Sequence, residues 1–177
     1  GTSHLTFCLK SNYVFDFFAR IKSVTDLLAL IMNHVFELKL KFEDCSLERG
    51  KVSNELRRKY SDAKIQNLAS NLDRVRNKWI SALYGMRNLI IHRGGLGFFF
   101  DGTGDSNFYV SGGSKEQQIL EDYLEKIEVK DSIYAVDLVS LCKHQWGKLA
   151  ELIEDIMIKS EQTIDVFLSS KQTEISK

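Results

Sequence analysis

The sequence predicts an all-α fold, an antiparallel bundle of four to five helices with one short β-hairpin inserted after the third helix. The 177 residues contain no proline, so long helices can run without interruption. Several long segments repeat apolar residues every three or four positions, the spacing of one helix face. Seven of the eleven glycines lie within residues 94–113, and this stretch therefore marks the non-helical insertion.

The first predicted helix covers residues 12–40. Its apolar stripe consists of Val14, Phe18, Ile21, Leu28, Ile31, Val35 and Leu38. A polar stretch over residues 43–51 breaks this pattern, and a second, mostly polar helix is expected over residues 52–69. These two helices make up the first part of the bundle.

A third helix is expected to begin with Asn71 or Asp73 as its cap, since both residue types favour that position. Its core stripe would consist of Val75, Trp79, Ala82, Leu83, Met86 and Ile90. It should end near His92, because Gly94 and Gly95 suit the left-handed conformation that terminates helices.

The glycine-rich stretch is predicted to form a hairpin with strands at residues 96–100 and 107–110. Ser114 and Gln117 have capping-box spacing, so a short helix is expected to begin there. The last helix should cover residues 132–168. Its predicted core face contains Ala135, Val139, Cys142, Trp146, Leu149, Ile153, Ile156 and Met157.

Length and composition predict a single helical domain over residues 1–177, because a chain of this size suffices for one hydrophobic core. Cys8, Cys45 and Cys142 are too widely spaced for a zinc site or a disulfide framework. This favours a reducing, cytoplasmic location. No apolar run approaches the roughly 20 residues needed to span a bilayer, so no membrane association is expected.

The net charge of zero conceals a strong separation of charges along the chain. Residues 51–93 contain ten basic and three acidic groups, a net of +7, whereas residues 101–177 contain eight basic and fifteen acidic groups, a net of −7. The basic segment predicts an anion-binding face. The alternative is that basic and acidic helices lie side by side and neutralise each other.

The end of the third predicted helix places Arg87, Asn88 and His92 in an otherwise apolar segment. A buried guanidinium is costly unless it is paired, so its presence there favours binding of an anion. This Arg-Asn-x3-His pattern, ending an apolar helix before two glycines, resembles the Arg-x4-His motif of the HEPN superfamily. These are small all-helical domains, many of which are ribonucleases.

The resemblance implies a metal-independent endoribonuclease with Arg87, Asn88 and His92 as its catalytic residues, acting in toxin or defence biology. His92 is suited to move a proton at the ribose 2′-OH or the leaving 5′-oxygen. Arg87 would stabilise the phosphate in the transition state. No acidic cluster accompanies these residues, so no metal site and no cofactor are expected. The products would be a 2′,3′-cyclic phosphate and a 5′-hydroxyl.

Helix geometry places Asn88 and His92 on one face, where the amide can orient the imidazole. Arg87 is rotated by about 140° from His92, so one helix cannot easily direct both groups at one phosphate. The long Arg87 side chain could wrap round, the helix could break before His92, or a second copy could complete the site. The resemblance favours a homodimer, with Ile80, Tyr84 and Ile91 as the apolar face it would bury.

RNA is the predicted partner. The predicted substrate-binding residues are Arg74, Arg76, Lys78, Arg93, Phe98 and Tyr109. The cations would contact phosphates, and the two aromatic residues would either stack on bases or seat the hairpin on the bundle.

An antitoxin or other regulatory protein is a further expected partner. In related toxins a tyrosine often stands two residues after the histidine and receives a nucleotide, but Gly94 occupies that position here. The alternative function is a non-catalytic helical module that dimerises and binds RNA or protein. Catalysis requires Arg87 and His92 to be open to solvent, whereas the module allows both to be sealed by ion pairs.

Overall fold

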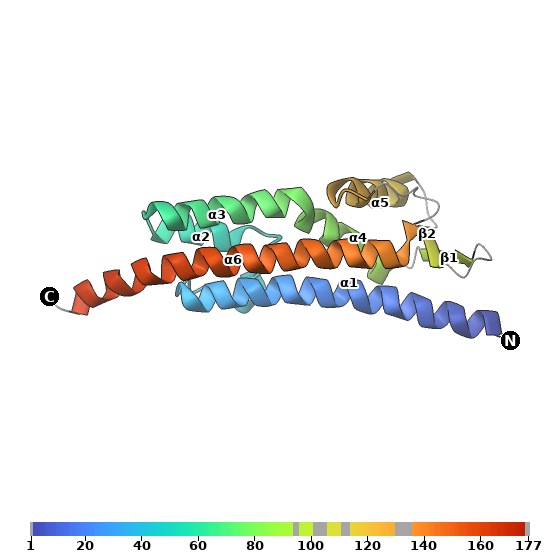
Figure 1. Cartoon of the computed structure of the whole chain (residues 1–177), viewed down its shortest axis with the longest axis horizontal. Helices are drawn as coiled ribbons and strands as arrows, with labels where there is room; N and C mark the ends of the chain where they lie inside the picture. The colour runs from blue at the N-terminus through green and yellow to red at the C-terminus, as the bar shows by residue number, and fades with distance from the viewer. Residues whose placement is uncertain (1, 94–95, 101–105, 111–113, 130–135, 176–177) are drawn as a thin grey trace. The chain divides into compact units, whose positions relative to one another are not determined.

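The computed structural model describes residues 2–93, 96–100, 106–110, 114–129 and 136–175 (Figure 1). The helices are α1 (Thr2–Val35), a 3-10 turn (Phe42–Asp44), α2 (Lys51–Lys59), α3 (Ala63–Val75), a π-helical turn (Arg76–Ile80), α4 (Ser81–Arg93), α5 (Ser114–Lys126) and α6 (Leu138–Ile175). The strands are β1 (Leu96–Phe100), β2 (Ser106–Val110) and β3 (Val136–Asp137). The predicted helical fold with a small β insertion is confirmed.

The boundaries of the second and third helices differ from the prediction. Asp62 caps α3, because its side chain accepts a 2.8 Å hydrogen bond from the backbone N–H of Lys64. The predicted start at Asn71 or Asp73 is therefore wrong, and both residues lie inside α3. The predicted helix over residues 52–69 is instead divided between α2 and α3.

Contacts along the chain group its residues into two compact units. The first unit contains Gly1–Thr25 and Asn77–Lys148, and the second contains Asp26–Arg76 and Leu149–Lys177. Helices α1 and α6 contribute residues to both. The single domain over residues 1–177 stays a prediction.

In the first unit, α4 packs against α5 around a fully buried Tyr123. The ring centroid of Tyr123 lies 5.5 Å from that of Phe18, and its hydroxyl donates a 2.7 Å hydrogen bond to Gln145 Oε1. Other buried side chains of this core are Val14, Ile21, Ile80, Leu83, Met86, Leu120, Leu124, Ile127 and Leu141. This core holds α4 in place.

The predicted hairpin is present in the first unit, where β1 and β2 pair in antiparallel register with Phe98 opposite Phe108. The third strand, β3, pairs with β2 through Asn107 and Asp137 and was not predicted. With only two residues, it is too short to show the alternation by which strands are recognised. The predicted start of the last helix at residue 132 lies outside the described residues, and α6 begins at Leu138.

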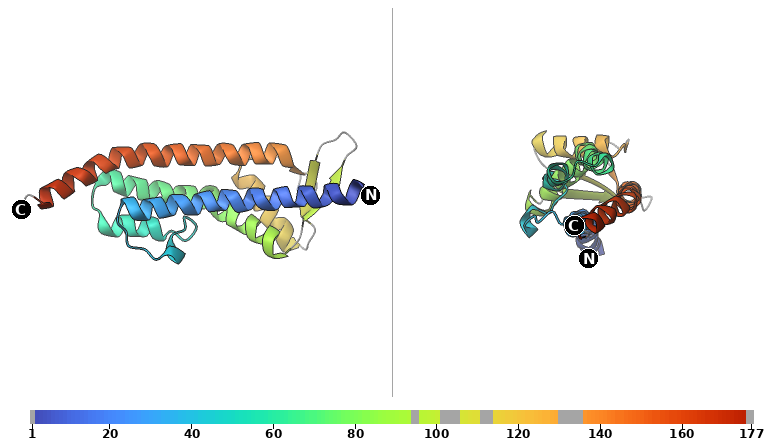
Figure 2. Two further views of the ribbon diagram at one scale, coloured as in Figure 1. Left: turned by 90° about the horizontal axis from the view of Figure 1, so that it is seen from below. Right: turned by 90° about the vertical axis from the view of Figure 1, so that its left-hand side faces the viewer.

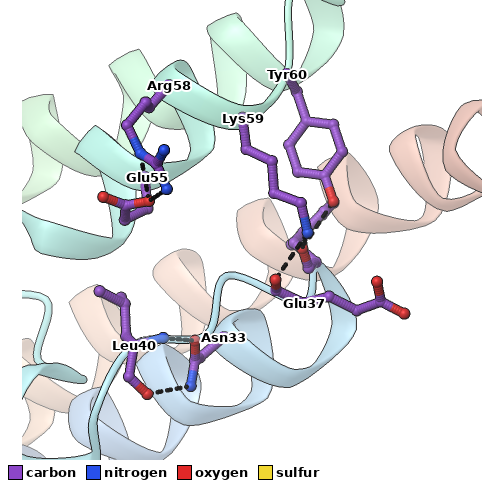
Figure 3. A network of polar contacts seen from close by, with 8 residues as sticks. Asn33, Glu37, Leu40, Glu55, Arg58, Lys59 and Tyr60 are labelled. Carbon is purple, nitrogen blue, oxygen red and sulfur yellow. Dashed lines mark hydrogen bonds and ion pairs between the residues drawn. The ribbon is translucent and has the colours of Figure 1, made fainter.

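In the second unit, α1 ends at Val35 and not at the predicted residue 40. Glu37 and Lys39 take left-handed conformations, with φ of 48° and 60°. Figure 3 shows the network that holds this turn. The Asn33 side chain accepts a 2.9 Å hydrogen bond from the backbone N–H of Leu40 and donates one to the Leu40 carbonyl. The Tyr60 hydroxyl donates a 2.7 Å hydrogen bond to the Phe36 carbonyl. These bonds compete with a helical continuation.

Asp73 is the centre of a polar cluster that joins α2 to α3 in the second unit. Its carboxylate accepts a 2.7 Å hydrogen bond from Ser53 Oγ and forms ion pairs with Arg57 at 2.5 Å and Arg76 at 3.1 Å. Burial alone raises the pKa of Asp73, but the hydrogen bonds from Ser53 and Arg57 and the charge of Arg76 lower it overall. The cluster therefore favours an ionised carboxylate.

The buried face of α6 also differs from the prediction. Among the side chains that the structure describes on α6, the buried ones are Leu141, Gln145, Leu149, Leu152 and Ile156, at steps of three or four. Trp146 and Met157 were predicted to be in the core but are 63% and 65% exposed. The helix carries apolar residues on more than one face, and periodicity alone did not identify the packed one.

Candidate active site

Helix α4 positions the three predicted catalytic residues and is buried around most of its circumference. Its buried side chains are Ala82, Leu83, Tyr84, Met86, Leu89 and Ile90. Ser81, Asn88 and Ile91 are exposed, and Arg87 is half-buried. The helix is thus held by the core while one strip of it stays open to solvent.

Arg87 and Asn88 form a pair on this open strip. Arg87 Nη1 donates a 2.9 Å hydrogen bond to Asn88 Oδ1, and Arg87 Nε is buried. The bond fixes the guanidinium, a planar group that can bind a phosphate through two parallel N–H donors. The backbone of His92 lies one turn further along α4, but its side chain is outside the described residues.

Lys22 of α1 brings a further cation to α4 within the first unit, and the sequence did not point to it. Its Nζ lies 5.4 Å from the ring centroid of Tyr84. Tyr84 precedes Arg87 and Asn88 by three and four residues, so the three share a region of the helix surface. Lys22 and Tyr84 are far apart in the sequence, and the packing of α1 against α4 brings them together.

Lys78, a predicted substrate-binding residue in the first unit, is exposed and forms a 3.5 Å ion pair with Glu128. Glu128 also accepts a 3.0 Å hydrogen bond from Lys148. The bond from Lys148, together with the charges of Lys148 and Lys78, lowers the pKa of Glu128. The charge of Lys78 is therefore offset by an acidic residue of its own unit.

The structure describes only the backbone at three other predicted substrate-binding residues. Arg93 is the last residue of α4. Phe98 lies in β1, and Tyr109 lies in β2 opposite Gly97. Their side chains lie outside the described residues, so base stacking stays a prediction.

Arg74 and Arg76 belong to the second unit and differ from each other. Arg74 is exposed and donates a 2.9 Å hydrogen bond to Asn71 Oδ1. The Arg76 guanidinium pairs with Asp73 and fills the position that a β-carbon at Gly50 would take. Arg76 therefore has a structural role in this unit, while Arg74 retains an exposed charge.

Most of the apolar face that was predicted to form the dimer interface is already buried within the single chain. Ile80 and Tyr84 are 1% and 4% exposed, and Ile91 is 36% exposed. The expectation that all three residues form an open face is wrong, because Ile80 at the end of the π-helical turn and Tyr84 of α4 are both buried in the core of the first unit.

Among the described residues, no three His, Cys, Asp or Glu side chains are grouped as a metal site. Within those same ranges, no helix has the length and apolar character needed to cross a membrane.

Comparison with known proteins gives a match to a family model. The model of a family described as Cthe2314-like HEPN matches residues 9–165. No curated protein and no solved structure is detectably similar to this chain. The match includes all of α4 and the Arg-Asn-x3-His pattern.

Proposed function

The chain belongs to the Cthe2314-like HEPN family, and we propose that it is a metal-independent endoribonuclease that uses Arg87, Asn88 and His92. The observation that carries the proposal is the hydrogen-bonded Arg87–Asn88 pair on the open strip of α4, one turn before His92. A guanidinium held by its neighbour loses little conformational freedom when it binds a phosphate. The pair is therefore suited to substrate binding.

In the proposed reaction, the ribose 2′-oxygen attacks the adjacent phosphorus and the 5′-oxygen leaves. One general base removes the 2′-OH proton, and one general acid gives a proton to the leaving oxygen. His92 would perform one of these transfers, since imidazole titrates near neutral pH. Arg87 would stabilise the negative charge that gathers on the phosphate.

A second copy of the chain would complete the site in this proposal. Arg87 is rotated by about 140° from His92 on one helix, so two copies of α4 could present an arginine and a histidine to the same phosphate. The exposed residues Asn88 and Ile91 mark the strip of α4 that would face the second copy. Toxin or defence biology is the proposed setting, with RNA as substrate and an antitoxin as regulator.

A non-catalytic module that binds RNA or protein is the second candidate, and one observation favours it. Arg76 and Lys78 both form ion pairs within their own units, as expected if the basic segment mainly neutralises acidic residues of the bundle. This candidate keeps the fold and the dimer but assigns Arg87 and His92 to contacts between proteins.

Cleavage of end-labelled RNA, with and without EDTA, tests the proposal. The wild type should cut in EDTA and leave 2′,3′-cyclic phosphate ends. His92→Ala should lower the rate by about 10² to 10⁴, and Arg87→Ala by at least about 10². Ser81→Ala, on the exposed surface of the same helix, is the control and should cut normally.

Two results would contradict the proposal. A folded His92→Ala protein that cuts RNA as fast as the wild type would remove His92 from the chemistry. A wild type that binds RNA without cutting it would favour the second candidate.

A further inference from the structure

The second unit contains a large apolar groove that the proposed ribonuclease reaction does not use. It lies between the last turns of α1 and the middle of α6, which run side by side (Figures 1 and 2). Its volume is about 1050 Å³, and within the described part of the chain the residues that line it are apolar except Glu154 and Glu161. Such an apolar surface is costly to leave in water.

The groove is long enough to hold a short helix. On α6 its walls extend from Ala150 to Ile164, which is about 21 Å at a rise of 1.5 Å per residue. Two of the lining side chains, Ile31 and Met157, are 48% and 65% exposed, so the groove is open along its side. This geometry admits a helix of about four turns lying lengthwise.

A small polar ligand fits the groove less well than a helix does. Sites for small molecules combine apolar walls with a few converging polar groups that fix the orientation of the ligand. Among the lining side chains that the structure describes, Glu154 and Glu161 are the polar ones. Seven residues apart, they lie almost in line on α6, two turns from each other, and do not converge on one point.

The charge of α6 indicates what kind of helix would fit. Between residues 149 and 164 the acidic residues are Glu151, Glu154, Asp155 and Glu161, whereas Lys159 is the single basic residue. A second copy of α6 would bring like charges to the rim. A helix with Lys or Arg beside its apolar stripe would complement it.

The chain's own basic helices already have their apolar faces buried in this unit. Val52 and Leu56 of α2 and Ile65 and Leu68 of α3 are each at most 2% exposed, and α2 packs against α3. Neither helix could enter the groove without opening that core. Neither α2 nor α3 is therefore the occupant of the groove.

We propose that the groove binds a basic amphipathic helix of a partner protein. The partner helix has an apolar stripe at steps of three and four residues and two Lys or Arg residues seven positions apart, which face Glu154 and Glu161. Its apolar side chains fill the space between Ile31 and Met157.

The test uses the full 177-residue chain and fluorescein-labelled 18-residue peptides, with binding followed by fluorescence anisotropy. One peptide carries a Leu stripe flanked by two Lys seven residues apart, and a second has Glu in place of both Lys. The Lys peptide should bind at least about tenfold more tightly than the Glu peptide. The double variant Glu154→Lys with Glu161→Lys should reverse this preference. Glu151→Lys, outside the groove, should keep it.

Removing an apolar contact gives an independent measurement. Ile31→Gln should lower the affinity for the Lys peptide by about tenfold. Leu27→Gln, at an exposed α1 residue that does not line the groove, should have no effect, and circular dichroism should show both variants folded.

Three results would overturn the proposal. Equal affinity of the two peptides would remove the charge argument. A dimer in light scattering that Ile31→Gln dissociates would make a second copy the occupant. Binding of a fatty acid that Ile31→Gln abolishes, with neither peptide bound, would make the groove a lipid site.

Discussion

The guanidinium of Arg76 occupies the space directly beside the α-carbon of Gly50, where any other residue would carry a side chain. Gly50 also has a φ of 66°, in the left-handed region that disfavours residues with a β-carbon. Gly50 thus allows the chain to enter α2 while Arg76 reaches Asp73. The arrangement gives one residue of the basic segment a structural role.

Gly50→Ala should lower the free energy of unfolding by about 1–3 kcal/mol, because it adds left-handed strain and displaces Arg76. Urea denaturation measures this change. The control is Gly147→Ala in α6, where nothing lies within 4 Å of an added β-carbon. That variant should be neutral or more stable by up to about 1 kcal/mol. Equal effects of the two substitutions would contradict the account of Gly50.

Arg74→Glu and Arg76→Glu should have different effects. Arg76→Glu places a negative charge beside Asp73 and should destabilise the protein. Arg74→Glu, at an exposed position, should change stability little. If Arg74 contacts RNA, its reversal should reduce the slope of log affinity against log salt by about 0.7. RNA titrations at several salt concentrations, with urea denaturation of each variant, separate the two roles.

Asp73 should make stability depend on acid pH. Its folded-state pKa is below the ordinary value of 3.8, so the unfolded state takes up protons first as the pH falls. The stabilisation from Asp73 is complete above pH 3.8 and is lost as the pH falls through the folded-state pKa. Thermal melts should show this loss in the wild type and a smaller one in Asp73→Asn. Parallel curves for the two proteins would be evidence against it.

Lys22 should contribute to substrate binding if the proposed site on α4 is correct. Lys22→Gln removes a charge close to Tyr84 and should raise the KM for RNA several-fold while changing kcat less, because uniform binding is lost. Arg20→Gln, at a neighbouring exposed residue paired with Asp16, is the matched control. A similar loss in both variants would point to a general charge effect.

The buried hydrogen bond between Tyr123 and Gln145 should contribute to the free energy of unfolding. Tyr123→Phe leaves Gln145 Oε1 buried without its donor, which should cost about 1–3 kcal/mol. Adding Gln145→Leu removes the acceptor as well, so the double variant should recover part of that stability. Urea denaturation of both single variants and the double variant measures the coupling. Additive effects would show that the bond contributes nothing specific.

The sequence by itself determined the features that depend on local chemistry. Absence of proline and helical periodicity gave the all-α fold, and the glycine-rich stretch gave the hairpin at β1 and β2. The pattern Arg87, Asn88 and His92 identified the HEPN family, which the match over residues 9–165 confirms. These features follow from backbone preferences and short spacings, so no contact between distant residues was needed to find them.

Only the tertiary structure decided which helix faces are buried and which basic side chains form ion pairs. Trp146 and Gln145 are neighbours on α6, yet the indole is exposed and the amide is buried, where its Oε1 accepts a hydrogen bond from Tyr123. Arg74 and Arg76 are both arginines of the same segment, and only Arg76 lies against Asp73 and Gly50. Burial and ion pairing depend on which helices pack together, and that information is not contained in the periodicity of any single helix.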